Sequence, residues 1–364
     1  MSGYTFAPFN GTDAAWDALI RALPCAHPLQ TSVWGSFKQR STGWQPEKFI
    51  WRDDSGAVGA AALLLTRRVG FLRVLYMPKA PMLNYADSAL LAQVLDDLAR
   101  LARRRFAVQL KIDPDVVQHT GEPNTPDWQT DPLGAVVVAT LQRRGWRFSA
   151  EQVQFKNTVL LDLTRSEDAL LAAMTQSKRR KVRYGVRHGV TIRTAGLADL
   201  PAMVALYVET GKRNAFTTRP AAYYLDEWRT LLEAGLAHAL IAEVNGQMVA
   251  HVVLLAFGQK CLYFSGASTS DNELRKLMAA DALQWEAMLW AKANGFTVYD
   301  MWGAPTHFEE SDPLWGVWLF KRDYGGVLTW YIGAWDYAPF TPLYWLYTQA
   351  MPRLRAWLRR KRPR

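Results

Sequence analysis

The sequence predicts an α/β protein that contains two tandem copies of one domain. Its 364 residues exceed one ordinary domain and fit two, each long enough to bury its own core. Residues 49–83 have the pattern of three strands joined by short turns, and residues 239–268 repeat that pattern. In both copies a long amphipathic segment and one more strand come next. A recurring order of elements indicates a duplicated domain.

The first copy can be followed element by element. A turn at Ser55–Gly56 separates its first two strands, and its third strand ends at Tyr76. Residues 86–105, ADSALLAQVLDDLARLARRR, have apolar residues at helical spacing, which predicts an amphipathic helix. Residues 107–114, AVQLKIDP, predict the strand that follows this helix.

The second copy has clearer turn and helix-end signals. Asn245–Gly246 lies between two apolar runs and is typical of a two-residue type I′ hairpin turn. Residues 272–295 predict one helix that Gly295 closes, and residues 297–303 predict the last strand of this copy.

The repeat also indicates where one domain gives way to the next. Residues 155–163, FKNTVLLDL, have the pattern of a strand that opens the second copy. We therefore expect a first domain of residues 1–154 joined by the C-terminal residues 336–364, and a second domain of residues 155–335.

Composition indicates a soluble cytoplasmic protein. Hydrophobic residues make up 49% and charged residues 21% of the chain, as in ordinary globular domains. No run approaches the ~20 apolar residues that cross a bilayer, and the N-terminus lacks the pattern of a signal peptide. Cys25 and Cys261 are far apart and fit neither a disulfide framework nor a zinc site, so we expect no metal.

Positive charge is concentrated in two segments of a chain whose net charge is +10. Residues 351–364 contain seven Lys/Arg and no acid, and residues 178–187 contain six Lys/Arg. Such segments favour a polyanionic partner, either nucleic acid or an anionic membrane surface. A solvated basic helix face is an equally good interpretation of residues 178–187.

The element order of both copies resembles the GNAT acyltransferase fold. That fold binds acyl-CoA at a glycine-rich loop that opens the central helix, where backbone N–H groups surround the pyrophosphate. Neither predicted helix opens with glycines, because residues 271–276 read DNELRK and residues 86–88 read ADS. The resemblance therefore implies acyl transfer from a donor other than CoA.

Several segments, in one order along the chain, resemble a particular family. They are residues 30–38 (QTSVWGSFK), 158–163 (TVLLDL), 177–183 (SKRRKVR), 209–216 (ETGKRNAF), 263–268 (YFSGAS) and 319–326 (LFKRDYGG). Each is weak alone, but the ordered set resembles the FemABX family of aminoacyltransferases, which build peptidoglycan cross-bridges. The resemblance implies two tandem GNAT-like domains of the compact FemX-like type. Phe216 leads directly into the second set of strands, which leaves no room for the coiled-coil arm of some members.

The resemblance implies transfer of an amino acid from aminoacyl-tRNA to an amine of a peptidoglycan precursor, without a cofactor. The acceptor would be the UDP-linked or the lipid-linked precursor. Because an aminoacyl ester is already activated, positioning the two reactants supplies much of the acceleration. The alternatives are a GNAT-type N-acyltransferase that uses acyl-CoA, and a non-catalytic protein that binds tRNA or membranes.

Three cations carry the main site predictions, all by family resemblance. Lys321 matches the family's catalytic lysine and would stabilise the oxyanion that develops on the ester carbonyl. The alternative is a lysine that caps a helix or pairs with Asp323. Lys38 and Arg213 match positions that contact the diphosphate of the precursor, and Lys and Arg both suit phosphate. The alternative for each is an ordinary surface salt bridge.

Aromatic residues and one histidine are weaker predictions. Tyr76 and Tyr263 end equivalent strands, and Tyr224 or Tyr223 follows the second basic position; these residues would contact the substrate. Aromatic residues at strand ends more often serve packing. His307, in an expected loop, would be a base or simply a solvated side chain.

The two basic segments are assigned to two partners. Lys178, Arg179, Arg180, Lys181 and Arg183 would bind tRNA, since A-form RNA is held mainly through phosphates and shape. The segment of residues 341–364 combines aromatic residues with arginines, as interfacial helices do. We therefore expect peripheral contact with the inner face of the cell membrane, or a terminal helix that packs back on the first domain.

Overall fold

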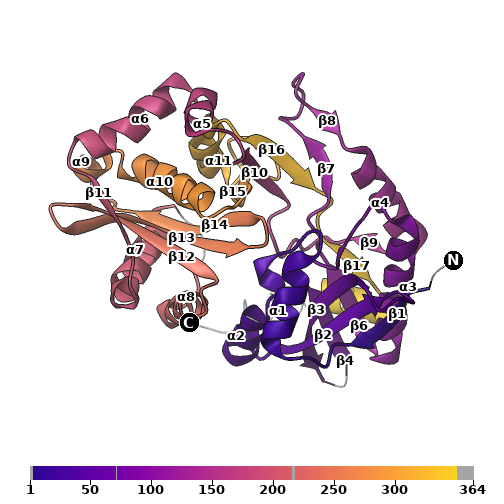
Figure 1. Cartoon of the computed structure of the whole chain (residues 1–364). Helices are drawn as coiled ribbons and strands as arrows, with labels where there is room; N and C mark the ends of the chain where they lie inside the picture. The colour runs from indigo at the N-terminus through magenta and orange to yellow at the C-terminus, as the bar shows by residue number, and fades with distance from the viewer. Residues whose placement is uncertain (1–2, 71, 215–217, 351–364) are drawn as a thin grey trace.

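The computed structural model describes residues 3–70, 72–214 and 218–350, which form two lobes that each surround one sheet (Figure 1). The strand order of the first sheet is β1-β2-β3-β4-β6-β17-β9, and β5 also pairs with β3. Its strands are β1 (Thr5–Pro8), β2 (Gln45–Arg52), β3 (Val58–Val69), β4 (Leu72–Met77), β5 (Met82–Leu83), β6 (Ala107–Ile112), β9 (Arg147–Phe148) and β17 (Trp335–Tyr337).

The second sheet has the order β11-β12-β13-β14-β15-β10-β16-β7-β8. Its strands are β7 (Val117–Thr120), β8 (Gln129–Thr130), β10 (Asn157–Asp162), β11 (Thr191–Thr194), β12 (Ala237–Val244), β13 (Gln247–Phe257), β14 (Lys260–Ser268), β15 (Val298–Asp300) and β16 (Val327–Tyr331).

The duplication predicted from the sequence is confirmed by the connections. In the first lobe β2, β3 and β4 form an antiparallel meander, α3 (Ser88–Arg104) follows, and β6 pairs parallel with β4. In the second lobe β12, β13 and β14 form the meander, α10 (Ala279–Ala293) follows, and β15 pairs parallel with β14. Each lobe therefore has one pair of neighbouring parallel strands, β4 and β6 in the first lobe and β14 and β15 in the second.

Local sequence explains the ends of these elements. The Asp87 side chain accepts hydrogen bonds from the backbone N–H groups of Ala89 and Leu90 and so begins α3. Asn245 and Gly246 both have positive φ, 50° and 75°, as the type I′ hairpin between β12 and β13 requires.

The expectation of one helix over residues 272–295 is wrong in one respect. The segment forms α9 (Asn272–Arg275) and α10, with a break at Met278, whose φ is +55°. The reason lies in α6 (Gln176–Arg187), which packs on α10. A side-chain carbon at Gly185 of α6 would lie only 3.0 Å from the Leu277 carbonyl oxygen. The break is thus caused by a tertiary contact, and the apolar periodicity of this segment does not reveal that contact.

Helices cover both faces of both sheets. In the second lobe α6 and α10 lie on one face, and α7 (Leu200–Arg213) and α8 (Ala221–Glu233) on the other (Figure 1). In the first lobe α3 and α4 (Pro132–Arg143) pack on one face, and α1 (Asp13–Ala22) and α2 (Ser32–Thr42) on the other. The shorter helices are Pro28–Gln30, α5 (Glu167–Ala173), Leu197–Asp199, α11 (Trp315–Lys321), Arg322–Tyr324, α12 (Thr341–Trp345) and Leu346–Ala350.

The two lobes share a hydrophobic core. Trp34 and Phe37 of α2 belong to the same buried cluster as Leu231 of α8 and Leu262 of β14. Burying such large side chains from both lobes together fixes how the two sheets face each other. The connection from α7 to α8 spans only residues 214–220, which is too short for a helical arm. No helix within the described ranges is long and apolar enough to cross a membrane.

One pair of strands crosses the expected domain boundary. β7 and β8, which precede residue 154, extend the second sheet because β7 pairs with β16. β17, close to the C-terminus, pairs with β6 and β9 of the first sheet. A division at residues 154–155 and 335–336 therefore stays a proposal, and the β7–β8 hairpin crosses it.

Candidate functional site

One strand, β14, carries the predicted residue Tyr263 and contacts two others, Lys321 and Arg213. Its pairing with β13 shifts at Phe264, because Leu254 faces Tyr263 whereas Val253 faces Ser265. Such a bulge inserts one extra residue and redirects the neighbouring side chains, and bulges are common next to active sites. Tyr263 contacts Lys321, while Phe264 packs edge-on against Trp34 of α2. The bulged strand therefore contacts Lys321 of the second lobe and Trp34 of the first.

Lys321, the predicted catalytic residue, is buried at the C-terminal end of α11. Only 4% of it is exposed, and its side-chain nitrogen donates to the carbonyl oxygens of Trp302 and, at 2.7 Å, Gly303. The nitrogen also lies 5.6 Å from the centre of the Tyr263 ring. An ammonium group has three N–H donors, so two carbonyls leave one donor for another partner.

The backbone beside Lys321 has an uncommon conformation. Trp302 has φ +56° although it is not glycine, and Gly303 has φ +27°. Non-glycine residues rarely occupy this region, and they concentrate at functional sites. Asp300 holds the turn, because its carboxylate accepts from the Trp302 backbone N–H at 2.8 Å. Burial lowers the pKa of Lys321 to about 7, and only the negative charge of Asp300 opposes this shift.

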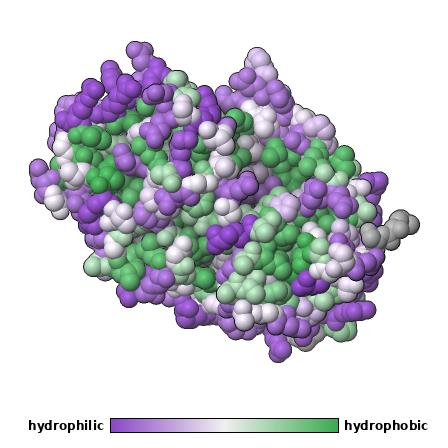
Figure 2. Space-filling view, viewed as in Figure 1, coloured by the Kyte–Doolittle hydropathy of each residue, from purple (hydrophilic) through white to green (hydrophobic). Residues whose placement is uncertain are grey.

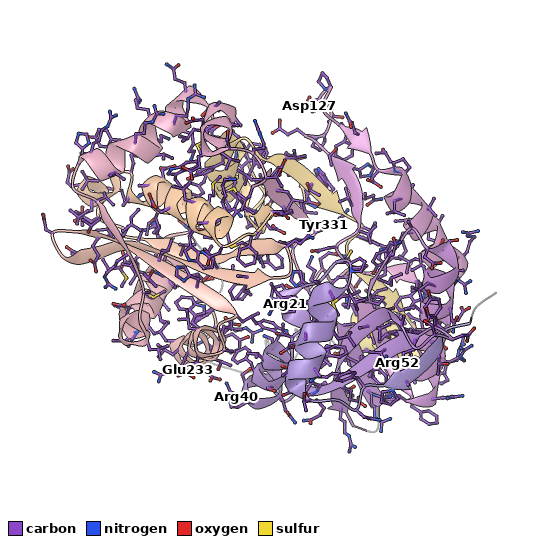
Figure 3. The ribbon with its side chains drawn as sticks, viewed as in Figure 1. Arg21, Arg40, Arg52, Asp127, Glu233 and Tyr331 are labelled. Carbon is purple, nitrogen blue, oxygen red and sulfur yellow. The ribbon has the colours of Figure 1, made fainter. Side chains whose placement is uncertain are left out.

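A chain of buried charges crosses from Asp300 into the first lobe. Lys260 lies 3.5 Å from Asp300 and 2.7 Å from Asp115, and Lys79 lies 2.9 Å from Asp115. Lys79 and Lys260 also lie over the ring of Tyr331, which Figure 3 labels at the junction of the two lobes. Burial opposes charge on Asp115, yet the two lysines hold its pKa well below the usual value.

The chain of polar contacts continues to Tyr76. The Tyr76 hydroxyl donates to Asp113 at 2.7 Å, and Asp113 also accepts from the Lys79 backbone N–H. Burial raises the pKa of Asp113 to about 6, although Lys79 and its hydrogen bonds oppose the shift. The buried His27 lies 4.0 Å from Asp115, and burial lowers its pKa to about 3.

Sequence reasoning missed most of this buried network. Its unpredicted members are His27, Lys79, Asp113, Asp115, Lys260 and Asp300. One signal was available: Asp113 and Asp115 directly follow a strand that is buried throughout, so their carboxylates had to find partners.

Lys38 lies between the lobes among aromatic rings. Its side-chain nitrogen donates to the Tyr223 hydroxyl at 2.6 Å and lies 4.2 Å from the centre of the Trp34 ring. Burial lowers the pKa of Lys38 to about 8, while Glu227 opposes the shift. Burial in turn raises the pKa of Glu227 to about 7. Lys38 is thus a partly desolvated cation rather than a member of a surface salt bridge.

Arg213 is fixed at the other end of β14. Its guanidinium donates to the carbonyl oxygens of Ser268, at 2.7 Å, and Thr269, at 2.9 Å. Among the described residues no hydrogen bond or ion pair joins Arg213 to Lys38, so their action on one diphosphate stays a prediction. Tyr224 packs against Tyr207 and Trp228 within the α7–α8 layer. Phe216 lies outside the described residues.

The basic segment on α6 divides into two groups. Lys178 is buried and pairs with Asp281 at 2.6 Å, and Arg179 donates to the carbonyl of Met174 at 2.6 Å. Arg180 and Arg183 are exposed, and Lys181 is half-buried. The surface over α5 and α6, at the upper left of Figure 2, is hydrophilic.

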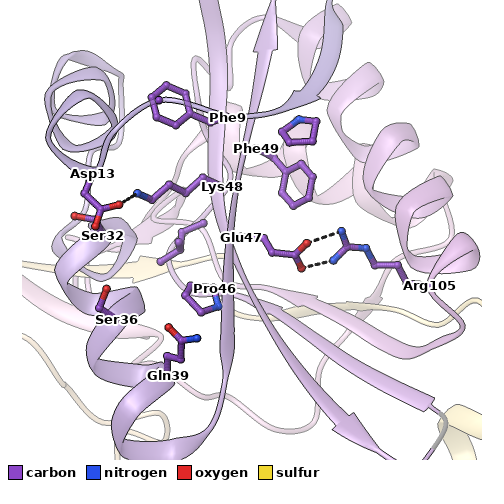
Figure 4. Close-up of a pocket in the computed structure, with 13 residues that line it drawn as sticks. Phe9, Asp13, Ser32, Ser36, Gln39, Pro46, Glu47, Lys48, Phe49 and Arg105 are labelled. Carbon is purple, nitrogen blue, oxygen red and sulfur yellow. Dashed lines mark hydrogen bonds and ion pairs between the residues drawn. The ribbon is translucent and has the colours of Figure 1, made fainter.

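A cavity of about 490 Å³ lies elsewhere, between α1, α2 and β2 (Figure 4). Its charged side chains pair with each other, Lys48 with Asp13 at 2.5 Å and Arg105 with Glu47. Because these ion pairs satisfy the lining charges, no free charge is left there to select a ligand. None of the predicted site residues lines this cavity.

His307 and the cysteines add little to the site. The His307 side chain is exposed in the irregular segment before α11, where its backbone N–H donates to Asp312 at 2.9 Å. Cys25 and Cys261 are both free thiols. Within the part of the chain that the structure describes, no three His, Cys, Asp or Glu side chains gather where a metal ion would bind.

The repeated meander, helix and parallel strand define the class of protein: two tandem GNAT-like domains. The crystal structure of FemX has a similar fold, with a TM-score of 0.81 and 22% identity over 93% of this chain and 99% of that chain. A tandem GNAT protein from the clavulanic acid biosynthesis pathway is similar with a TM-score of 0.53 and 15% identity, over 92% of this chain and 98% of that chain.

The model of the FemAB family matches residues 12–245 and 229–351, and the chain belongs to that family. A relative in Staphylococcus haemolyticus (strain JCSC1435), named lipid II:glycine glycyltransferase, is 24% identical over 413 aligned positions. The alignment covers 95% of this chain and 96% of the relative. The alignment spans 413 positions, more than the 364 residues of this chain, so the relative contains segments that this chain lacks. The chain is accordingly an enzyme of the transferase class.

Proposed function

We propose that this protein transfers an amino acid from aminoacyl-tRNA to an amine on the stem peptide of a lipid-linked peptidoglycan precursor. Membership of the FemAB family supports transfer in cross-bridge synthesis. The name of the staphylococcal relative, lipid II:glycine glycyltransferase, favours the lipid-linked acceptor over the UDP-linked one. The transferred amino acid is a matter for experiment.

The buried amine of Lys321 is the observation that carries this proposal. In the reaction the acceptor amine attacks the ester carbonyl, a C–N bond forms, and the C–O bond to tRNA breaks. The proton that the amine loses leaves with the tRNA hydroxyl. Protonated Lys321, held by the carbonyls of Trp302 and Gly303, would direct its third N–H at the oxyanion. Little water reaches this amine, so the interaction would be strong.

The helix N-termini argue against acyl-CoA as the donor. In the first lobe the Asp87 carboxylate already accepts from the first N–H groups of α3. In the second lobe α6 packs against the start of α10, and the acid Asp281 lies in the first turn of α10. A carboxylate that already accepts from these N–H groups, as Asp87 does, competes with a pyrophosphate for them and repels it. The GNAT-type N-acyltransferase is therefore the weaker alternative.

Lys38 and Arg213 are proposed to bind the diphosphate of the acceptor. Lys38 lies at the junction of α2 and α8, and Arg213 ends α7 beside the end of β14. Both cations have lost part of their hydration through burial, which lowers the pKa of each. A phosphate group would restore the missing counter-charge.

Contact with a lipid surface is proposed for the end of the first lobe. Phe106, Phe340, Trp345 and Leu346 are all exposed, and the rings of Phe106 and Phe340 stack at 6.4 Å. Arg103, three residues before Phe106, lies over the ring of Tyr337. Aromatic residues beside arginines suit the headgroup region of an anionic membrane. The basic residues 351–364 lie outside the described residues, and their part in this contact stays a prediction.

The decisive experiment is a transfer assay with mixed radiolabelled aminoacyl-tRNAs and both forms of the precursor. We expect label on the lipid-linked precursor with wild-type protein and none with Lys321→Met. Lys292→Met is the matched control, because Lys292 is also a lysine that donates to a backbone carbonyl, that of Leu163. Transfer by Lys321→Met at the wild-type rate would refute the catalytic role. No transfer from any tRNA, together with tight acyl-CoA binding, would favour the acyl-CoA alternative.

Membrane contact has its own test. Sedimentation with vesicles that contain about 30% anionic lipid should recover wild-type protein and much less of a Phe106→Ser, Trp345→Ser double variant. Equal recovery of both proteins would place any lipid contact elsewhere.

A further inference from the structure

Lys178 belongs to the basic segment of α6, yet its side chain points into the protein. Its nitrogen donates to the Asp281 carboxylate at 2.6 Å and to the Phe320 carbonyl oxygen at 3.0 Å. It also lies over two rings, 4.5 Å from the centre of Phe320 and 4.3 Å from that of Tyr324. Phe320 directly precedes Lys321, so Lys178 holds the peptide beside the proposed catalytic residue.

Further contacts join the start of α6 to the same segment. The backbone N–H of Thr175, the residue that caps α6, donates to the Asp323 carbonyl at 3.1 Å. Gly325 lies so close to the turn between α5 and α6 that a side-chain carbon there would lie 2.5 Å from the Ala173 carbonyl oxygen. The Tyr324 hydroxyl donates to Asp281, the partner of Lys178. Residues 320–325 are thus bound on several sides to the α5–α6 corner.

The outer face of α6 differs from this inner face. Arg180, Arg183 and Arg187 are exposed there, with the stacked rings of Tyr184 and His188. One helix therefore presents arginines to solvent, the nearest of them (Arg180) two residues from Lys178, and inserts that lysine beneath the Lys321 segment. A short helix whose inner face is packed on a neighbouring helix, as α6 is on α10, moves as a unit rather than bending.

We propose that Lys178 is a positioning residue that couples α6 to Lys321, so that RNA phosphates bound by the outer face of α6 fix the position of the Lys321 amine. This inference rests on the proposed use of aminoacyl-tRNA. It reassigns Lys178 from direct RNA contact to an internal role. The exposed arginines, not Lys178, then determine affinity for the RNA.

Removal of Lys178 would leave specific groups without a partner. Asp281 would lose its cation, and the Phe320 carbonyl would lose a donor in a partly buried position. The other charged groups that act on Lys178 are Lys181 of α6 and Asp323. Because the Asp281 carboxylate would be left mostly buried without its cation, we expect the end of α11 to shift so that water can reach it.

The first test uses the pKa of Lys321 to report whether its amine has moved, and it needs no tRNA. The side-chain pKa of Lys321 is measured by NMR titration in full-length wild type, Lys178→Met, Lys178→Arg and the control Lys292→Met. We expect both Lys178 variants to raise this pKa by about one unit or more, because the amine gains water as the α11 end moves. Lys178→Arg provides the measurement if Lys178→Met does not fold, since a planar guanidinium cannot keep both contacts beneath the two rings.

The second test separates coupling from binding. In the transfer assay the Lys178 variants should lose about tenfold or more in kcat, with little change in the KM for aminoacyl-tRNA. Wild-type values of both the Lys321 pKa and kcat in a folded Lys178 variant would overturn the inference. So would a raised KM with unchanged kcat, which would make Lys178 an RNA contact. If wild type shows no tRNA-dependent transfer, the proposed function fails, and the titration still decides whether Lys178 positions Lys321.

Discussion

The side-chain nitrogen of Lys321 donates to the backbone carbonyl of Gly303 at 2.7 Å, so a backbone turn holds this lysine. The sequence also allowed a pair with Asp323, but the partner of Asp323 in the structure is Arg322, at 3.9 Å. A carbonyl oxygen accepts a hydrogen bond without carrying a full negative charge. The lysine is therefore oriented by its partners while its pKa is lowered by burial to about 7.

The low pKa of Lys321 predicts a distinctive pH dependence. If the protonated amine stabilises the oxyanion, kcat should fall as pH rises through about 7. Because the acceptor amine titrates as well, the informative quantity is the ratio of wild-type kcat to that of Lys321→Arg, which keeps its charge. We expect this ratio to decline above pH 7. A ratio that rises there would assign Lys321 the role of a base.

The same burial predicts that Lys321 reduces stability. Its folded-state pKa lies below the unfolded value of 10.5, so the unfolded chain binds more protons between about pH 7 and 10.5. Stability therefore increases with pH over that window and is lowest below it. Lys321→Met should remove this dependence and raise Tm near neutral pH by about 2–4 °C. A lower Tm for this variant in calorimetry would show that the lysine stabilises the fold.

Lys38 should affect the acceptor rather than the donor. Lys38→Glu should raise the acceptor KM by about tenfold or more, because it replaces a partly buried cation with an anion facing a diphosphate. The donor KM should change little. Arg40→Glu is the matched control, since Arg40 lies on the same helix but forms an exposed ion pair with Asp226. Steady-state kinetics that show equal effects of the two substitutions on the acceptor KM would contradict the proposed clamp.

Asp115 should be essential for the junction of the lobes. Asp115→Asn would leave Lys79 buried without its carboxylate partner and Lys260 with Asp300 alone, and it should cost about 3–5 kcal/mol in urea unfolding. Asp226→Asn, which breaks an exposed pair, should cost less than about 1 kcal/mol.

The pH dependence gives a second readout of the same carboxylate. Its lowered folded-state pKa means that Asp115 contributes stability above the ordinary aspartate pKa and that this contribution is lost as pH falls below it. Asp115→Asn should therefore lose less stability between pH 5 and pH 3 than wild type does. Similar unfolding free energies for the two Asn variants would refute the central position of this residue.

The exposed face of α6 should bind RNA through phosphates. Arg180→Glu with Arg183→Glu should raise the KM for aminoacyl-tRNA and reduce the slope of log affinity against log salt by about two. An exposed pair on the other lobe, Arg52→Glu with Arg143→Glu, serves as the charge-matched control. If both pairs weaken tRNA equally, the effect reflects net charge, and α6 is not a specific RNA surface.

The sequence predicted the parts of the fold that depend on local pattern. The duplicated meander, the turn at Asn245–Gly246 and the helix after each meander are confirmed, because periodicity and turn chemistry act over a few residues. The break at Met278 was not predictable in this way, since its cause is contact with Gly185, almost a hundred positions earlier in the chain.

The candidate site was accessible only where a family motif marked it. Lys321, Lys38 and Arg213 were named by resemblance, and their roles stay predictions. The ion pair between Lys260 and Asp115 joins residues 145 positions apart, and no local pattern indicates such a partner. The inward direction of Lys178 was hidden for a similar reason: six cations in one short segment give no sign of which one is buried.

Because strands from one half of the chain pair in the sheet of the other half, no single cut of the chain separates the two lobes into complete sheets. The β7–β8 hairpin extends the sheet of the later half, and β17 fills a place in the sheet of the earlier half. Neither sheet is therefore complete without strands from the other half of the chain, and removing them would expose unpaired strands that invite association with other chains. The two halves have become mutually dependent, and selection can now alter one of them only while the other still completes its sheet.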